Sequence, residues 1–228
     1  MAENNEQVSL NHIADIYLYE YYIAADKSYD LISDEACKKY IENGRRLTNE
    51  GNYSEAINEF SKALEYNPVN VAVINKIVSC YKYLHDIEKE FEYAQKTYNF
   101  CCTRSELATY YRNVGWYYLE KYKPEVSVAC YMYSNLFEKS EQNENEIHFL
   151  EVATQKSYKN LSIEEIQETL KENNIPIEAS SVTLALMYRA GLEALSLGNK
   201  TQAYECFFMV YDLTQDEEVK ELMERSRS

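Results

Sequence analysis

The amino-acid sequence predicts an all-α fold built from repeated helical hairpins, and three observations support this. The 228 residues include only five glycines and three prolines, too few for the turns of a β-sheet protein, while helix formers occur throughout. Gly51 follows Gly44 by seven positions, and Gly198 follows Gly191 by the same interval. After each pair a small residue, an aromatic residue and a second small or β-branched residue follow at matching positions: Ala56, Phe60 and Ala63, then Ala203, Phe207 and Val210.

The glycines have two predicted roles, because glycine inside a helix costs about 1 kcal/mol relative to alanine and needs a compensating reason. Gly44, Gly115 and Gly191 are expected where the backbone of a neighbouring helix approaches closely. Gly51 and Gly198 are expected at helix C-termini, where the chain needs a positive φ. A second helix should begin directly after each of these turns. The N-cap of this second helix is predicted to be Asn52, with Glu55 as its partner, in the first hairpin and Asn199, with Gln202, in the last.

These residues resemble the tetratricopeptide repeat, a helix-turn-helix unit that recurs about every 34 residues. The match is strongest from Tyr40 to Pro68, and a second copy covers Met187 to Val210. The resemblance implies an α-solenoid, a right-handed superhelix of about five antiparallel hairpins with a capping helix at each end. It also implies that the first helices of successive hairpins line a concave groove.

The whole chain, residues 1–228, is predicted to form a single elongated domain. In the N-terminal capping region, 9–34, apolar spacing predicts one amphipathic helix from Leu10 to about Lys27 that covers the first repeat. Hairpins are expected at 35–68, 69–103 and 105–139. In the second hairpin the large and small residues are exchanged, because Phe91 stands where the repeat usually has alanine and Ala94 where it usually has an aromatic residue. In the third, serines replace the alanines of the repeat at Ser127 and Ser134.

The C-terminal third of the chain departs from the repeat and then returns to it. The polar residues 140–146 predict a loop. A divergent hairpin or an insertion is expected within 144–175, where Ser162 and Glu165 form a capping box. The last hairpin is predicted at 179–214, and a polar capping helix at 216–226.

Charge and cysteine content limit the partners and the compartment. A net charge of −15 at pH 7 disfavours DNA, RNA and anionic membranes. No apolar run approaches the roughly 18 residues of a membrane span and no signal peptide is visible, so we expect a cytoplasmic protein. The six cysteines lack CxxC spacing and are expected to be buried thiols in a reducing compartment: Cys37, Cys80, Cys101, Cys102, Cys130 and Cys206.

The sequence suggests no catalytic, cofactor or metal site. The three histidines are far apart, and the adjacent thiols of Cys101 and Cys102 have no second ligand pair. The few glycines exclude a phosphate-binding loop. No nucleophile, base and stabiliser converge in the pattern, so we expect a non-enzymatic protein without a cofactor.

The surface that the resemblance implies as functional is the concave groove. It places a basic and amide-rich strip there, made of Ile41, Arg45, Asn75, Lys76, Ser79, Arg112, Asn113 and Trp116. Such a strip can hold an acidic peptide or a C-terminal carboxylate, with an apolar anchor at the tryptophan. It can equally be the solvated side of the helices, and Trp116 also suits a partly buried core position. The family's carboxylate clamp is not preserved, because Ile41, Arg45, Lys76, Thr109 and Asn113 stand at its positions.

The leading interpretation is a protein–protein interaction module that binds a peptide or protein segment in the groove, with Arg45, Lys76 and Arg112 facing solvent. The alternative is a peptide-responsive regulatory sensor without a DNA-binding domain of its own. In that case groove occupancy moves the N-terminal helix or residues 162–172. An enzyme would need catalytic groups assembled from separate helices. The sequence predicts neither the partner's identity nor the oligomeric state.

Overall fold

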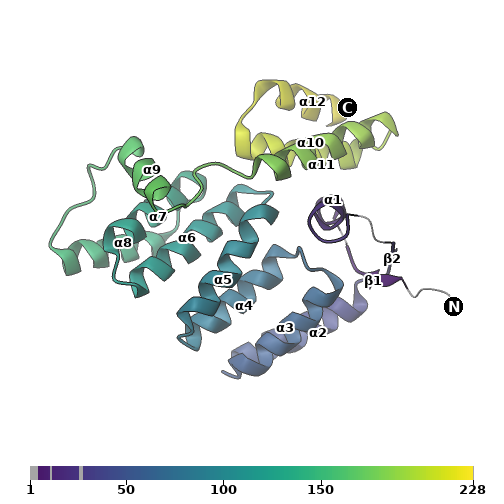
Figure 1. Ribbon diagram of the computed structural model, residues 1–228. Helices are drawn as coiled ribbons and strands as arrows, with labels where there is room; N and C mark the ends of the chain where they lie inside the picture. The colour runs from purple at the N-terminus through teal and green to yellow at the C-terminus, as the bar shows by residue number, and fades with distance from the viewer. Residues whose placement is uncertain (1–4, 11, 26–27, 228) are drawn as a thin grey trace.

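Helices dominate the chain (Figure 1). The computed structural model describes residues 5–10, 12–25 and 28–227. The first half contains β1 (Glu6–Val8), α1 (Ile13–Tyr22), β2 (Tyr29–Leu31), α2 (Glu35–Asn49), α3 (Tyr53–Tyr66), α4 (Val71–Tyr83), α5 (Ile87–Thr97) and the short 3₁₀ helix η1 (Tyr98–Phe100). The second half contains α6 (Arg104–Glu120), α7 (Pro124–Phe137), α8 (Glu141–Thr154), α9 (Ile163–Glu172), α10 (Ser181–Ser196), α11 (Lys200–Thr214) and α12 (Glu217–Arg227). The predicted all-α class is confirmed, with one small addition at the N-terminus.

Three hairpins form the solenoid, and they are the pairs α2/α3, α4/α5 and α6/α7. Successive hairpins stack because α3 packs against α4 and α5 packs against α6. In Figure 1 the stack runs from α2 to α8, which lies at its far end. The elongated, helical-repeat architecture expected from the glycine pattern is therefore present over α2 to α7.

The helix-interior glycines lie where a neighbour approaches closely, as predicted, but the neighbour is an aromatic ring and not a backbone. An ideal Cβ on Gly44 would lie 2.5 Å from Phe60 Cε1, and one on Gly191 would lie 2.7 Å from Phe207 Cε1. Gly115 faces Tyr131 in the same way at 2.9 Å. The turn glycines have φ of 78° at Gly51 and 75° at Gly198, so the predicted left-handed conformation is confirmed at both.

The three predicted N-cap positions are confirmed, and the side-chain cap hydrogen bond forms at two of them. Ser162 and Glu165 form a complete capping box at the start of α9. The Asn199 side chain accepts a hydrogen bond from the Gln202 amide at the start of α11. Asn52 stands at the N-cap of α3, as predicted, but its side chain makes no cap hydrogen bond, so only the capping interaction was wrong there.

Residues 140–146 are not the predicted loop, because α8 begins at Glu141. The helix brings the polar side chain of Asn143 into a buried position, where it donates to the Tyr131 carbonyl oxygen at 2.6 Å and to Ser134 Oγ at 3.3 Å. These hydrogen bonds offset the cost of burying an amide. Both α8 and α9 pack mainly against α7, so they do not form the antiparallel hairpin expected within 144–175.

The N-terminal segment is more than a single capping helix. The helix α1 is shorter than predicted and ends at Tyr22, while the expected end near Lys27 lies outside the described residues. Two strands flank it, and β1 pairs in parallel with β2. The extended segment is held because the Ser9 amide donates to the Tyr66 carbonyl oxygen at the end of α3.

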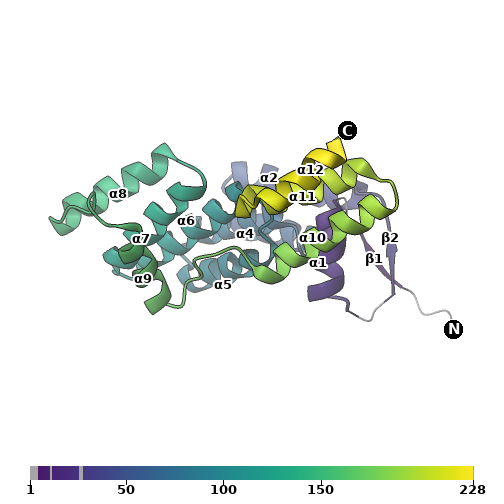
Figure 2. The ribbon, with the colours of Figure 1, turned by 90° about the horizontal axis from the view of Figure 1, so that it is seen from above.

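The C-terminal hairpin α10/α11 returns to the N-terminal end of the molecule, where it packs against α1 (Figures 1 and 2). The Tyr17 hydroxyl of α1 donates to Glu193 Oε2 of α10 at 2.7 Å. Asp15 accepts a hydrogen bond from Asn67, which follows α3. The helix α1 therefore bridges the last hairpin and the first instead of capping the first hairpin alone.

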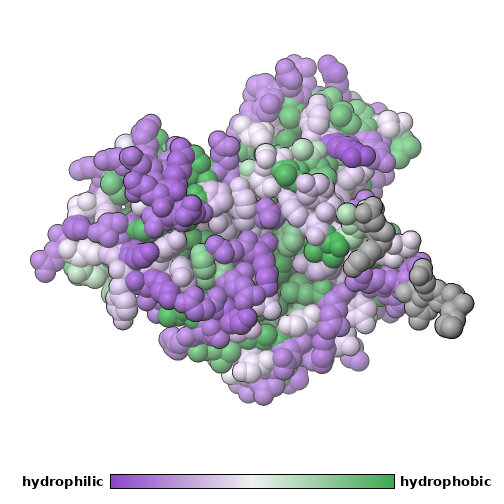
Figure 3. All heavy atoms as spheres, in the orientation of Figure 1, coloured by the Kyte–Doolittle hydropathy of each residue, from purple (hydrophilic) through white to green (hydrophobic). Residues whose placement is uncertain are grey.

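The surface is hydrophilic over most of the face in Figure 3, in keeping with the net charge of −15. All six cysteines are buried and none forms a disulfide. No helix in the described part of the chain is long and apolar enough to cross a bilayer.

Candidate functional site

Two adjoining cavities form a groove across the first helices of the hairpins. The first has a volume of about 400 Å³ and is lined by Arg45, Thr48, Asn49, Phe60, Lys76, Ser79 and Tyr83. The second has a volume of about 310 Å³ and is lined by Ser79, Lys82, Tyr83, Thr109, Arg112, Asn113, Trp116, Tyr131, Gln142, Asn143 and Glu146. Since the two share Ser79 and Tyr83, they are continuous along α4. We call them the α2–α4 cavity and the α4–α8 cavity.

Most of the predicted groove residues line these cavities. Arg45 and Lys76 line the first, Ser79 lines both, and the second contains Arg112, Asn113 and Trp116. Asn75 lines neither cavity, but its Oδ1 accepts a hydrogen bond at 3.1 Å from Nδ2 of Asn113, which lines the second. Ile41 also lines neither cavity, because its side chain packs against the core between α2 and α3.

Arg45 and Lys76 form a pair of cations in the α2–α4 cavity, and neither makes a salt bridge with a described residue. Burial lowers the pKa of Lys76, and the nearby Arg45 guanidinium lowers that pKa further. Their carboxylate-free cavity is unusual in a chain with 38 acidic residues. The cavity is therefore electrostatically suited to an anionic group.

Lys82 lines the α4–α8 cavity and was not among the groove residues predicted from the sequence. Its Nζ donates to Asn113 Oδ1 at 2.8 Å and lies 5.2 Å from the centroid of the Trp116 ring. Nζ also lies 3.6 Å from Oε1 of Glu90, a fully buried residue on α5. Helical spacing contained a signal for Lys82, because Asn75, Ser79 and Lys82 recur on one face of α4.

Glu90 is an unusual buried acid behind this cavity. Both of its carboxylate oxygens are buried without a hydrogen-bond partner in the described structure. Burial raises the pKa of Glu90 from 4.5 to about 7, although the Lys82 ammonium opposes the shift. Burial also lowers the pKa of Lys82, although the negative charge of Glu90 opposes this shift. The two residues thus form a strongly desolvated ion pair beside the groove.

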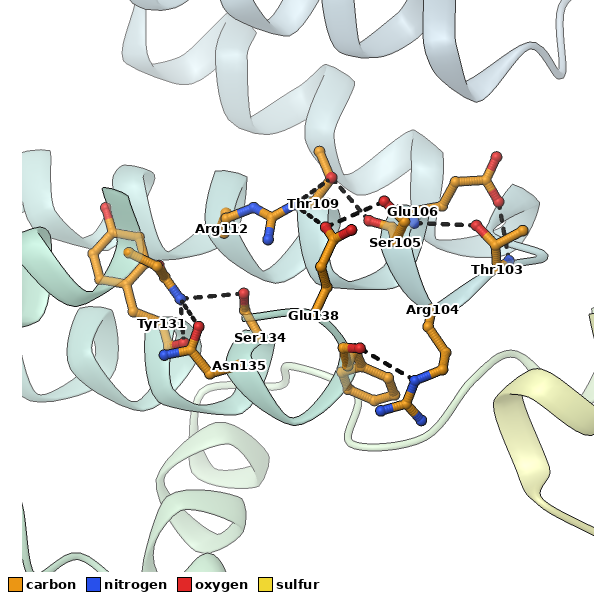
Figure 4. A network of polar contacts seen from close by, with 12 residues as sticks. Thr103, Arg104, Ser105, Glu106, Thr109, Arg112, Tyr131, Ser134, Asn135 and Glu138 are labelled. Carbon is orange, nitrogen blue, oxygen red and sulfur yellow. Dashed lines mark hydrogen bonds and ion pairs between the residues drawn. The ribbon is translucent and has the colours of Figure 1, made fainter. Parts of the chain in front are cut away.

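Arg112 is held by neighbouring side chains, contrary to the expectation that it faces solvent. Its Nη2 donates to Thr109 Oγ1 at 2.9 Å and to Glu138 Oε2 at 3.1 Å (Figure 4). The side chain is 24% exposed, and its Nη1 is buried without a partner among the described residues. Arg112 therefore forms part of the wall, with one donor unused.

The far wall of the α4–α8 cavity comes from the first turns of α8, within residues 140–146, for which the sequence predicted a loop. Gln142, Asn143 and Glu146 of this helix line the cavity. The Oδ1 of the buried Asn143 has no hydrogen-bond partner in the described structure. No residue of α1 lines either cavity, so the N-terminal helix does not fill the groove.

Comparison with known proteins gives little beyond the fold. No protein-family model matches the sequence, and no curated protein matches it. Among solved structures, the chain is similar to YrrB, described as a TPR protein with an unusual peptide-binding site. The two are 12% identical with a TM-score of 0.43, and the alignment covers 86% of this chain and 100% of that one. Similarity at this level says nothing about what the present chain binds.

Proposed function

We propose that the protein is a non-enzymatic interaction module whose groove binds an extended acidic segment of a partner protein. The observation that carries the proposal is the Arg45–Lys76 pair, two cations in one cavity without a salt bridge to a described residue. A carboxylate of the partner would relieve their mutual repulsion and restore the charge that burial disfavours on Lys76. Charge-assisted hydrogen bonds to both residues would favour an anion over a neutral side chain.

The rest of the groove supports binding of an extended backbone. The α4–α8 cavity is lined by the exposed side chains of Ser79 and Gln142, whose hydroxyl and amide groups suit the carbonyl and the N–H of a peptide. Trp116 supplies a half-buried apolar surface beside them. The partner thus presents its acidic residue to the α2–α4 cavity and its main chain to the α4–α8 cavity.

A display library of acidic dodecapeptides, selected on the intact chain, tests this proposal. The double variant Arg45→Glu/Lys76→Glu should lose at least about tenfold in affinity for the selected peptides, measured by fluorescence anisotropy. The control is Lys171→Glu/Lys200→Glu, which changes net charge equally at two exposed positions away from the groove. Equal losses in both double variants, or no selected peptide, would contradict the proposal.

The regulatory alternative draws support from the bridge that α1 makes. Asn67, which follows α3 and precedes α4, donates to Asp15 of α1 at 2.9 Å. A shift of α4 on ligand binding would therefore reach α1 and, through Tyr17, the hairpin α10/α11. Hydrogen exchange with a selected peptide distinguishes the two functions. Protection confined to α2, α4, α6 and α8 indicates simple capture, whereas altered protection in α1 indicates a switch.

A further inference from the structure

The helix α8 has one face that is packed and another that is exposed and apolar. Asn143 and Leu150 lie buried on the packed side, against α7. On the other side Phe149 is 59% exposed and Val152 is 66% exposed. Ala153 is also exposed, and Tyr122 from the turn between α6 and α7 is 93% exposed nearby. We call Tyr122, Phe149, Val152 and Ala153 the α8 patch.

The α8 patch is uncovered because the repeat stops there. In the preceding hairpins each first helix is covered by the second helix that follows it, whereas α9 leaves α8 and packs on α7. The helix lies at one end of the elongated molecule in Figure 2. Beside the patch is a cavity of about 500 Å³, bounded by Leu119, Tyr122 and Pro124 on one side and by Phe149 and Ala153 on the other. An apolar face with a cavity of this kind marks an interaction surface.

We propose that the α8 patch binds a second copy of the chain, with the two α8 helices antiparallel about a two-fold axis near Val152. This inference is independent of the groove. Phe149 and Ala153 are one helical turn apart, so an antiparallel pair centred between them sets Phe149 of each copy against Ala153 of the other. Each ring then enters the cavity beside the small side chain. The surface is self-complementary in shape because it carries both the projection and the recess.

Charge along the helix favours the same antiparallel arrangement. The first half of α8 carries Glu141, Glu144 and Glu146, and its C-terminal end is followed by Lys156 and Lys159. In an antiparallel pair the acidic half of one helix lies beside the basic end of the other, whereas a parallel pair would set acid against acid. Lys156 is already paired with Glu125, its Nζ lying 2.6 Å from Oε1, whereas Glu141, Glu144 and Lys159 make no salt bridge with a described residue. These charges are therefore available to a second copy.

The first test is the oligomeric state in solution, because a small helical patch corresponds to a weak interface. Sedimentation of the full chain from about 1 to about 300 µM should show a monomer converting to a dimer. Phe149→Glu should weaken the dimer at least tenfold. Leu197→Glu, at an apolar position that is 77% exposed after α10, should leave it unchanged. Circular dichroism checks that both variants remain folded.

The second test locates the two-fold axis. Val152→Cys places a thiol near the axis, and all six native cysteines are buried, so mild oxidation should link two copies through that residue. Leu197→Cys is the matched control and should give little cross-linked product. A chain that stays monomeric, a dimer unaffected by Phe149→Glu, or equal cross-linking at both positions would overturn the proposal. If the chain is a monomer, the α8 patch would instead be a site for a helix of another protein. The proposed binding of acidic peptides in the groove would be unaffected by that result.

Discussion

The Phe60 ring occupies the space that a Cβ on Gly44 would need, with its Cε1 2.5 Å from the ideal Cβ position. The same relationship joins Gly191 to Phe207 and Gly115 to Tyr131, and sixteen positions separate the two residues in every pair. The second helix of a hairpin thus inserts an aromatic ring at the point where the first helix has no side chain. This contact fixes the distance and the register between the two helices.

Replacing Gly44 with alanine should destabilise the fold by about 1–3 kcal/mol, because the Phe60 ring is buried and cannot move aside without repacking. Helix propensity alone predicts the opposite sign, a gain of about 1 kcal/mol. Urea unfolding of Gly44→Ala measures the balance. The double variant Gly44→Ala/Phe60→Leu should recover part of the loss by making room. Stabilisation in the single variant would show that the ring yields easily.

This pattern explains which hairpins were predictable from the sequence. The hairpins that contain Gly44 and Gly191 can be recognised from the sequence because glycine is rare in this chain. In the hairpin α4/α5 the two positions hold Val78 and Ala94, both fully buried, so the larger and the smaller residue are exchanged. That exchange keeps the core filled but removes the glycine from the sequence. Such a hairpin is recognised by its helical periodicity alone.

The rest of the architecture could not be read from local pattern. The position of α9 on α7, and the return of α10/α11 to α1, depend on contacts between segments that are distant in sequence. The polar residues at the start of α8 look like a loop because the partners that satisfy Asn143 are Tyr131 and Ser134 on another helix. The candidate groove was predictable at Arg45 and Lys76 from repeat phase. The Lys82–Glu90 pair was not, because it joins α4 to α5 across a buried interface.

Substituting glycine for His85 should stabilise the protein by about 0.5–1 kcal/mol. His85 has a φ of 54° in the turn between α4 and α5, at the position that Gly51 occupies one hairpin earlier. The left-handed conformation costs a non-glycine residue about 1–2 kcal/mol, and the extra chain entropy of glycine cancels only part of that gain. Leu84→Gly is the control, since φ is −82° there and glycine should destabilise. Thermal unfolding of both variants gives the comparison, and equal effects would contradict the argument.

The buried Glu90 should make stability depend on pH in a defined direction. Its pKa is raised to about 7 in the folded state, so the folded protein binds this proton more tightly than the unfolded chain does. The stabilisation is complete below the unfolded pKa of 4.5 and is lost as the pH rises through 7. Relative to Glu90→Gln, the wild-type protein should therefore gain stability on the order of 2 kcal/mol between pH 8 and pH 4.5. Denaturant unfolding of both proteins across this range measures the difference, and parallel pH profiles would contradict it.

The Lys76 ammonium should be the groove's reporter of anion binding. Burial and Arg45 both lower its pKa from 10.5, so removing one of these causes must raise it. We expect Arg45→Gln to shift the titration of Lys76 to higher pH, measured by competitive acylation and mass spectrometry. An acidic peptide in the α2–α4 cavity should shift it in the same direction, because a carboxylate stabilises the ammonium. Binding should consequently weaken as the pH rises through the Lys76 pKa. A titration unchanged in Arg45→Gln would mean that the two cations do not interact.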